Sequence, residues 1–184
     1  MQTNYDNSLI SREFYVGQVY DNSLRQVDDC HLAGEYIPFG AAVYYDADTS
    51  TVKVLTDGSA GKEFFGIAVR TEYETVGQIL GGDTYSDTTT LTMSRTGYVK
   101  GSFVNVMKLG RIVVRLTGAN DKIGTGIWWD KTNANITEAN LPKIVAKNTT
   151  PTQGDVLIGY ALTTPKIGEV AIQITGVKAI PVAE

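Results

Sequence analysis

Short runs of strand-forming residues, separated by turn residues, recur along the whole chain and constrain its fold more than any other feature. The runs are rich in Val, Ile, Thr and Tyr, and Gly, Asp and Asn bound them. In residues 169–176 branched apolar residues alternate with Ala, Gln and Thr, which is the period of a half-buried strand. The sequence therefore predicts an all-β fold, built as an antiparallel sandwich or barrel.

Eight segments carry the strand pattern most clearly. They are residues 41–46, 51–55, 64–70, 88–94, 111–116, 126–130, 156–163 and 169–176. No window has the 3.6-residue apolar period of an amphipathic helix. Residues 20–33 and 137–147 are the segments that could hold a short helix.

Two parts of the chain repeat each other. Residues 40–46 read GAAVYYD and residues 124–130 read GTGIWWD, so glycine, a branched apolar residue, an aromatic pair and aspartate occupy the same offsets. Downstream, GIAVRT at 66–71 parallels GYALTT at 159–164. Two related β-subdomains, or two halves of one barrel or sandwich, would give this pattern. Convergent strand and turn patterns would give it as well.

The same signals suggest how the chain is organised. Residues 19–108 are expected to form a first β-rich unit and residues 109–184 a second, unless both belong to one continuous domain. Residues 1–18 hold few core-type side chains and are expected to form an extended arm. Residues 72–87 are polar and contain a Gly-Gly pair, which is typical of a long exposed loop. The candidate contact residues of the arm are Tyr5, Leu9, Phe14 and Tyr15.

Two aromatic pairs stand within the repeated segments. They are Tyr44 with Tyr45, and Trp128 with Trp129. Because neighbours in a strand point to opposite faces, one ring of each pair should face the core and the other should face solvent or a partner. The outward ring is then either an ordinary strand-edge aromatic, an interface anchor or a platform for stacking on sugar.

Composition excludes several classes of protein. The net charge of −4 disfavours a protein that follows a nucleic-acid backbone, which needs a basic surface. One cysteine cannot form a disulfide within the chain. No stretch approaches the roughly 20 apolar residues that span a bilayer. The polar N-terminus lacks the apolar run of a signal peptide, so we expect synthesis in the cytoplasm without membrane association.

A search for catalytic or metal-binding patterns yields no convincing site. The only histidine, His31, follows Cys30, and adjacent strand residues point apart, which disfavours a catalytic pair. Residues 46–51, DADTST, begin like a calcium loop but have threonine where that loop needs glycine. A turn capped by aspartate is preferred there. We expect no catalytic residue, no cofactor and no metal site, although remote paired carboxylates of a hydrolase leave no local trace.

Five segments occur in a characteristic order: GQVYDNSL at 17–24, IPFGAAV at 37–43, FFGIAVR at 64–70, and YVKGSFVNV at 98–106 leading into LGRIVV at 109–114. This ordered set resembles the phage structural cement protein family, the capsid decoration proteins of tailed phages. The resemblance covers about residues 17–130 and, more weakly, 156–176. Residues 1–16 cannot be placed on the family pattern, which leaves the role of the arm open.

The resemblance implies a non-enzymatic virion protein. Such a protein would bind the major capsid protein on the outer surface of the mature head and stabilise contacts between capsid subunits. We expect a homotrimer, with a dimer as the alternative, because closed symmetry is usual for such oligomers. Other readings stay open: a carbohydrate-binding β-module, or another virion component such as a head-fibre base or a tail protein.

Overall fold

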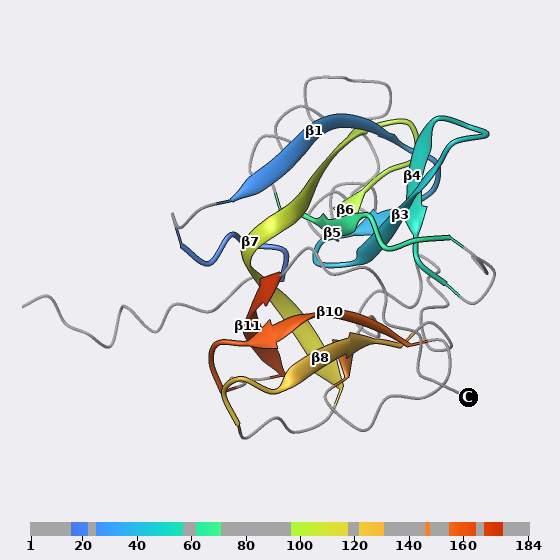
Figure 1. Cartoon of the computed structure of the whole chain (residues 1–184). Coiled ribbons are helices and arrows are strands. Elements are labelled where there is room, and N and C mark those ends of the chain that lie inside the picture. Colours follow the sequence, from blue (N-terminus) through green and yellow to red (C-terminus); the bar gives the residue numbers. More distant parts are fainter. Residues whose placement is uncertain are drawn as a thin grey trace, which may run out of the picture.

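The fold is built from β-strands. The computed structural model describes residues 16–21, 25–56, 62–70, 97–117, 122–130, 146–147, 155–164 and 168–174. The strands are β1 (Gln26–Ala33), β2 (Ile37–Pro38), β3 (Ala42–Asp46), β4 (Thr51–Val54), β5 (Gly66–Ala68), β6 (Gly97–Tyr98), β7 (Phe103–Thr117), β8 (Gly126–Trp129), β9 (Ala146–Lys147), β10 (Val156–Ala161) and β11 (Glu169–Ile174). These elements confirm the predicted all-β class (Figure 1). None of the described residues forms a helix that is long and apolar enough to cross a membrane.

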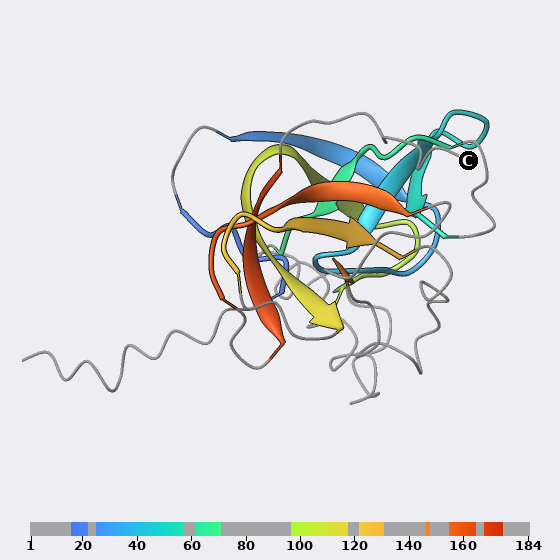
Figure 2. The same ribbon diagram turned by 60° about the horizontal axis from the view of Figure 1, so that its bottom comes forward.

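The strands close into two five-stranded rings that share β7. The first ring runs β1-β4-β3-β5-β7 and closes through the pairing of β1 with β7. The second runs β7-β11-β10-β8-β9 and closes through the pairing of β7 with β9. Figure 1 shows β7 passing from the upper ring into the lower one, and Figure 2 shows β10 (orange) lying beside its partner β8 (amber). The architecture is therefore a closed barrel in each half of the chain.

Both rings have the same topology. Taken in chain order, the first strand of each ring pairs with the third in parallel, β1 with β4 and β7 with β9. Every other pairing around both rings is antiparallel. The repeated sequence segments occupy equivalent strands, since β3 corresponds to β8 and β5 to β10. Register agrees as well: Val43 lies opposite Gly66, and Ile127 lies opposite Gly159.

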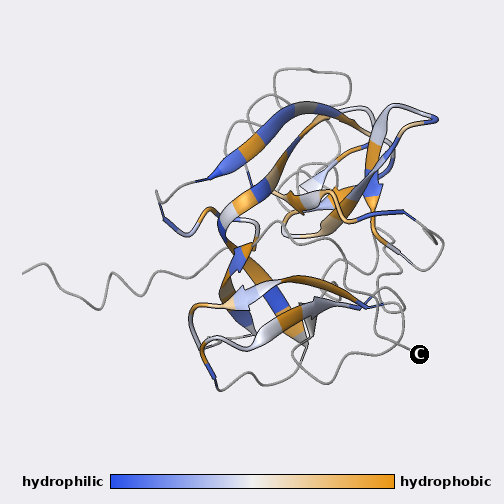
Figure 3. Cartoon of the chain, viewed as in Figure 1, coloured by the Kyte–Doolittle hydropathy of each residue, from blue (hydrophilic) through white to orange (hydrophobic). Residues whose placement is uncertain are grey.

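Strand β7 holds the two rings together. The division that the sequence suggested between residues 108 and 109 falls inside this strand. Gly110 has a φ of 133°, a conformation that side chains with a Cβ rarely adopt, and it stands where β7 leaves the first ring. A Cβ there would also come within 3.1 Å of the Met107 sulfur. One cluster of buried side chains draws on both rings, and Figure 3 shows polar and apolar residues interspersed along β7.

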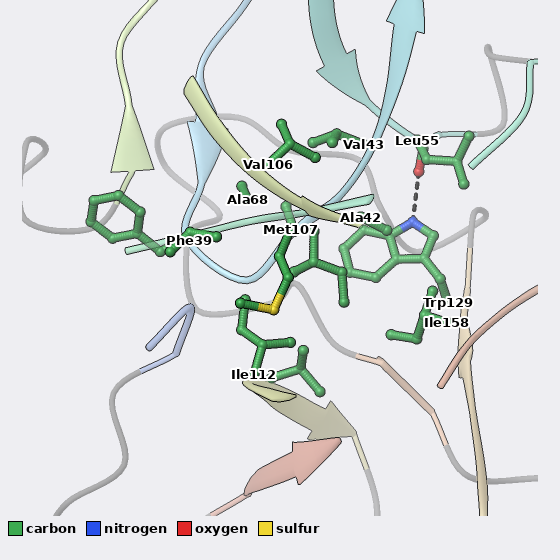
Figure 4. Packing of buried hydrophobic residues seen from close by; sticks show 14 of the residues in the cluster. Phe39, Ala42, Val43, Leu55, Ala68, Val106, Met107, Ile112, Trp129 and Ile158 are labelled. Atoms are coloured by element: carbon green, nitrogen blue, oxygen red, sulfur yellow. Dashed lines mark hydrogen bonds between the residues drawn. The ribbon is translucent and has the colours of Figure 1, made fainter. Parts of the chain in front are cut away.

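Trp129 lies in the core, at the junction between the rings. Only 1% of its surface is exposed. Its indole N–H donates a hydrogen bond of 2.7 Å to the carbonyl oxygen of Leu55, which follows β4 in the first ring. Figure 4 shows the indole between Ala42 of the first ring and Ile158 of the second. The indole therefore contributes both buried apolar surface and a satisfied polar group to the junction.

Several local expectations need correction. Residues 26–33, part of a segment that could hold a helix, form β1 instead, because pairing with β4 and β7 satisfies the backbone on both sides. Strand β7 begins at Phe103, well before the expected 111–116. The short strands β2, β6 and β9 were not expected. The candidate strand 88–94 and the loop 72–87 lie outside the described residues.

The C-terminal end of the expected arm lies along β7. The Gly17 N–H donates to the Val113 carbonyl oxygen at 2.8 Å, and the Gly17 carbonyl oxygen accepts from Arg70 N–H at 2.7 Å. Val19 forms an isolated antiparallel bridge with Ile112. Residues 16–18 are the described part of the expected arm, and residues 1–15 lie outside the described residues.

The two adjacent tryptophans should differ in their contribution to stability. Trp129→Ala removes a buried indole and leaves the Leu55 carbonyl without its donor, so we expect a loss of about 3–5 kcal/mol in unfolding free energy. Trp128→Ala, at a half-buried position, should cost only about 1 kcal/mol. Urea denaturation followed by circular dichroism measures both values. Equal losses in the two variants would contradict the placement of Trp129 at the junction.

Candidate interaction surfaces

Five side chains gather at the open end of the first ring. The His31 ring meets the Phe65 ring edge-on at 5.1 Å and the Tyr45 ring at 5.8 Å between centroids. Lys108 Nζ lies 4.0 Å from the centroid of the Phe65 ring and pairs with the Asp28 carboxylate. His31 Nε2 lies 3.9 Å from the same carboxylate. We call these five residues the mouth cluster; it offers aromatic surface together with one anion and one cation.

Charge within the mouth cluster is partly neutralised. The hydrogen bond from Lys108 holds the pKa of Asp28 below its ordinary value, against the opposing effect of burial. Tyr45 has 39% of its surface exposed, so the cluster is open to a partner. Its aromatic rings brace one another, which limits the side-chain entropy that a contact would cost.

A second surface lies on the outward side of the second ring. A Cβ on Gly126 would come within 3.2 Å of Trp128 Nε1, so the indole lies against the glycine backbone. Tyr160, which is 41% exposed, pairs with Gly126 on one side and with Gln173 on the other. We call Gly126, Trp128, Tyr160 and Gln173 the aromatic face. Flat aromatic rings beside a half-buried glycine offer a low-relief contact area.

The four predicted aromatic contact residues of the folded units take different places. Tyr44 packs partly buried against the core, whereas Tyr45 lies in the mouth cluster. Trp128 lies on the aromatic face, whereas Trp129 is part of the core. The alternation expected for strands thus divides each pair. The remaining candidates, Tyr5, Leu9, Phe14 and Tyr15, lie outside the described residues.

Sequence reasoning missed other exposed apolar residues. Phe103 is 59% exposed and lies directly opposite exposed Leu32 on the outward side of β1 and β7. Ile123 is 68% exposed in the turn before β8. Tyr160 was not among the candidates either, and His31 was considered only as a member of a catalytic pair. A strand pattern shows which residues share a face, but it does not show which face another part of the chain covers.

The segment that begins like a calcium loop has a structural role. Asp46 closes the turn between β3 and β4: its carboxylate accepts from the Asp48 N–H at 3.3 Å and from the Thr49 hydroxyl at 3.0 Å. This confirms the turn interpretation of the calcium-like segment. Lys53 Nζ donates to the same carboxylate at 2.7 Å. Within the described ranges, no three His, Cys, Asp or Glu side chains gather where they could hold a metal ion.

The ion pair between Asp46 and Lys53 should make stability depend on acid pH. The Lys53 hydrogen bond lowers the pKa of Asp46 below its ordinary value of 3.8. The stabilisation is therefore complete well above that value and is lost as pH falls through the lower pKa of the folded state. We expect Asp46→Asn to remove this part of the acid dependence, measured as unfolding free energy against pH.

Lys53→Met supplies the control for this prediction. It removes the cation that donates the hydrogen bond but keeps the carboxyl group and its longer ion pair with Lys62 at 3.8 Å, so it should flatten the acid dependence in the same direction but less completely. The double variant should add little to either single change, because both break one interaction. Additive losses in the double variant would show that the two side chains act separately.

Comparison with known proteins gives a family match and matches to solved structures. Residues 1–175 match the family described as "Structural cement protein (E217 gp24/Pam3 gp6)". The match includes residues 1–16, which sequence reasoning had not placed on the family pattern. The fold resembles a chain in the structure titled "The capsid of Myoviridae Phage XM1", with a TM-score of 0.61 and 14% sequence identity, over 92% of this chain and 96% of that one. No curated protein sequence gives a significant match.

Proposed function

The chain belongs to the structural cement protein family, and from this premise we propose that it binds the outer surface of a mature phage head and stabilises contacts between major capsid subunits. The family match over residues 1–175 is the observation that carries the proposal. The likeness of its fold to a chain from a phage capsid structure supports it. The proposed role is adhesive and needs no catalytic residue.

Adhesion can stabilise a shell through mass action. A subunit that binds the assembled lattice, and not free capsid protein, adds its binding free energy to that of the assembled state. An oligomer that touches several capsid subunits gains further, because the first contact raises the effective concentration for the next. We propose a homotrimer for this reason, with a dimer as the alternative.

The proposal is tested by sedimentation with shells. Purified protein should co-sediment with mature heads that lack it and should bind immature shells at least tenfold more weakly. Intact heads filled with DNA leave only the outer surface accessible, so binding to them locates the site. Equal binding to mature heads, immature shells and free capsid protein would remove the cement role.

The N-terminal segment is proposed to take part in capsid binding. Deleting residues 1–15 keeps Val16 and Gly17, and Gly17 is hydrogen-bonded to β7, so we expect the folded core to retain its thermal stability. Loss of an extended arm should weaken binding to mature heads, because such arms bury main chain along a neighbour only when docked. Occupancy on heads at several protein concentrations measures this. Unchanged occupancy would exclude the segment from the contact.

A further inference from the structure

The junction between the two rings is asymmetric. Inward-pointing residues at one end of the second ring pack against outward-pointing residues on the flank of the first ring, and all of them are nearly inaccessible to solvent. The residues shown at the junction in Figure 4 are Ile112, Trp129 and Ile158 from the second ring, and Ala42, Leu55 and Met107 from the first. An end that binds a flank is a heterologous contact, so among the described residues one end of the first ring and one flank of the second have no equivalent contact.

Strand register identifies the unused end. Ala68 pairs with Val106, and its counterpart Ala161 pairs with Ile172. Asp28 lies opposite Val106, so it is the counterpart of Ile112, which lies opposite Ile172. Gly66 and Gly159 are equivalent, so the preceding residues, Phe65 and Ile158, are counterparts. The aromatic pairs are also equivalent, so Tyr45 is the counterpart of Trp129. The unused end of the first ring is therefore the mouth cluster.

Register also identifies the unused flank. On the first ring, Ile67 pairs with Ala42 and with Met107. On the second ring, Tyr160 pairs with Gly126 and with Gln173 in the same arrangement. Ile67, Ala42 and Met107 are fully buried under the second ring, whereas Tyr160 is exposed. The aromatic face is therefore the counterpart of the flank that the junction covers.

The mouth cluster and the aromatic face are both more polar than the equivalent residues at the junction. In the mouth cluster, Asp28 and Lys108 stand where the second ring has Ile112 and Ile174. On the aromatic face, Gln173 stands in the position of Met107. Polar and tyrosine side chains tolerate water and still contribute contact area, which suits a surface that separate molecules form reversibly. Purely aliphatic counterparts would suit permanent burial.

Charge is balanced within each of the two halves. The mouth cluster holds the pair of Asp28 and Lys108. Beside the aromatic face, Arg111 bonds to Gln173 at 3.0 Å and to Asp21 at 2.6 Å. Each half thus presents one anion paired with one cation, so neither half carries an excess of charge that would repel the other.

We propose that the mouth cluster of one copy binds the aromatic face of a second copy, head to tail, in the manner of the junction inside each chain. Repetition of one heterologous contact closes into a ring when its rotation allows, and otherwise extends into a chain. The proposed function gives this contact its purpose. The contact itself can be measured between purified copies, without any capsid.

Complementary variants test the head-to-tail geometry. Tyr45→Glu disables the mouth cluster and Tyr160→Glu disables the aromatic face. Analytical ultracentrifugation over a dilution series should show that the wild type self-associates and that each variant alone associates at least tenfold more weakly, about 1.4 kcal/mol. Mixing the two variants should restore a one-to-one complex, because each retains the half that the other lacks.

Phe103→Glu is the matched control, since Phe103 is more exposed than either tyrosine but belongs to neither surface. It should associate like the wild type, whereas general hydrophobic adhesion would weaken it too. If Tyr45→Glu does not fold, Tyr45→Ser replaces it. A strictly monomeric wild type, undiminished single variants, or a mixture that stays monomeric would each overturn the proposal. Failure to bind heads with intact self-association would overturn only the proposed function.

Discussion

The shared strand β7 is the constraint on which the rest of the structure depends. Its 15 residues complete the first ring with one half and begin the second ring with the other. A strand that belongs to two closed rings must change direction where it leaves the first, and the positive φ of Gly110 accommodates that change. Because both rings close through β7, neither sheet has a free edge along this strand. Within the two rings, closed edges leave side chains, and not unpaired strand backbone, as the means of contact.

The two rings share a backbone plan and differ in what they expose. Glycines 66 and 159 occupy equivalent positions, and a Cβ at either would collide with the main chain of the last strand of its ring. At these points the backbone approach determines the residue. The equivalent residues Tyr45 and Trp129 face no such limit, and one is exposed while the other is buried. The two rings thus share one topology, while the first has charged side chains at positions where the second has aliphatic ones.

The sequence predicted those strands whose apolar pattern is local. Strands β3, β4, β5, β8, β10 and β11 fall within the expected segments. Strand β1 was missed because Asp28 and His31 stand where its counterpart in the second ring has Ile112 and Val114. The polar residues that interrupt the strand pattern of β1 are thus members of the mouth cluster. Which of two equivalent aromatic residues becomes buried depends on the packing of one ring against the other, and no local pattern contains that information.

An asymmetric junction has a consequence for any molecule built by repeating a ring. Such a junction covers one end of one ring and one flank of the next, and in the described part of this chain no ring covers the other end or the other flank. Aliphatic residues at those places would form an exposed patch prone to aggregation. Charges alone would keep the surface soluble but would give little adhesion, since exposed ion pairs contribute about 0–1 kcal/mol. Tyrosine beside paired charges lies between these extremes, and both terminal surfaces of this chain have that composition. The two proposed contact surfaces are thus the end and the flank that the junction between the rings does not cover in the described part of the chain.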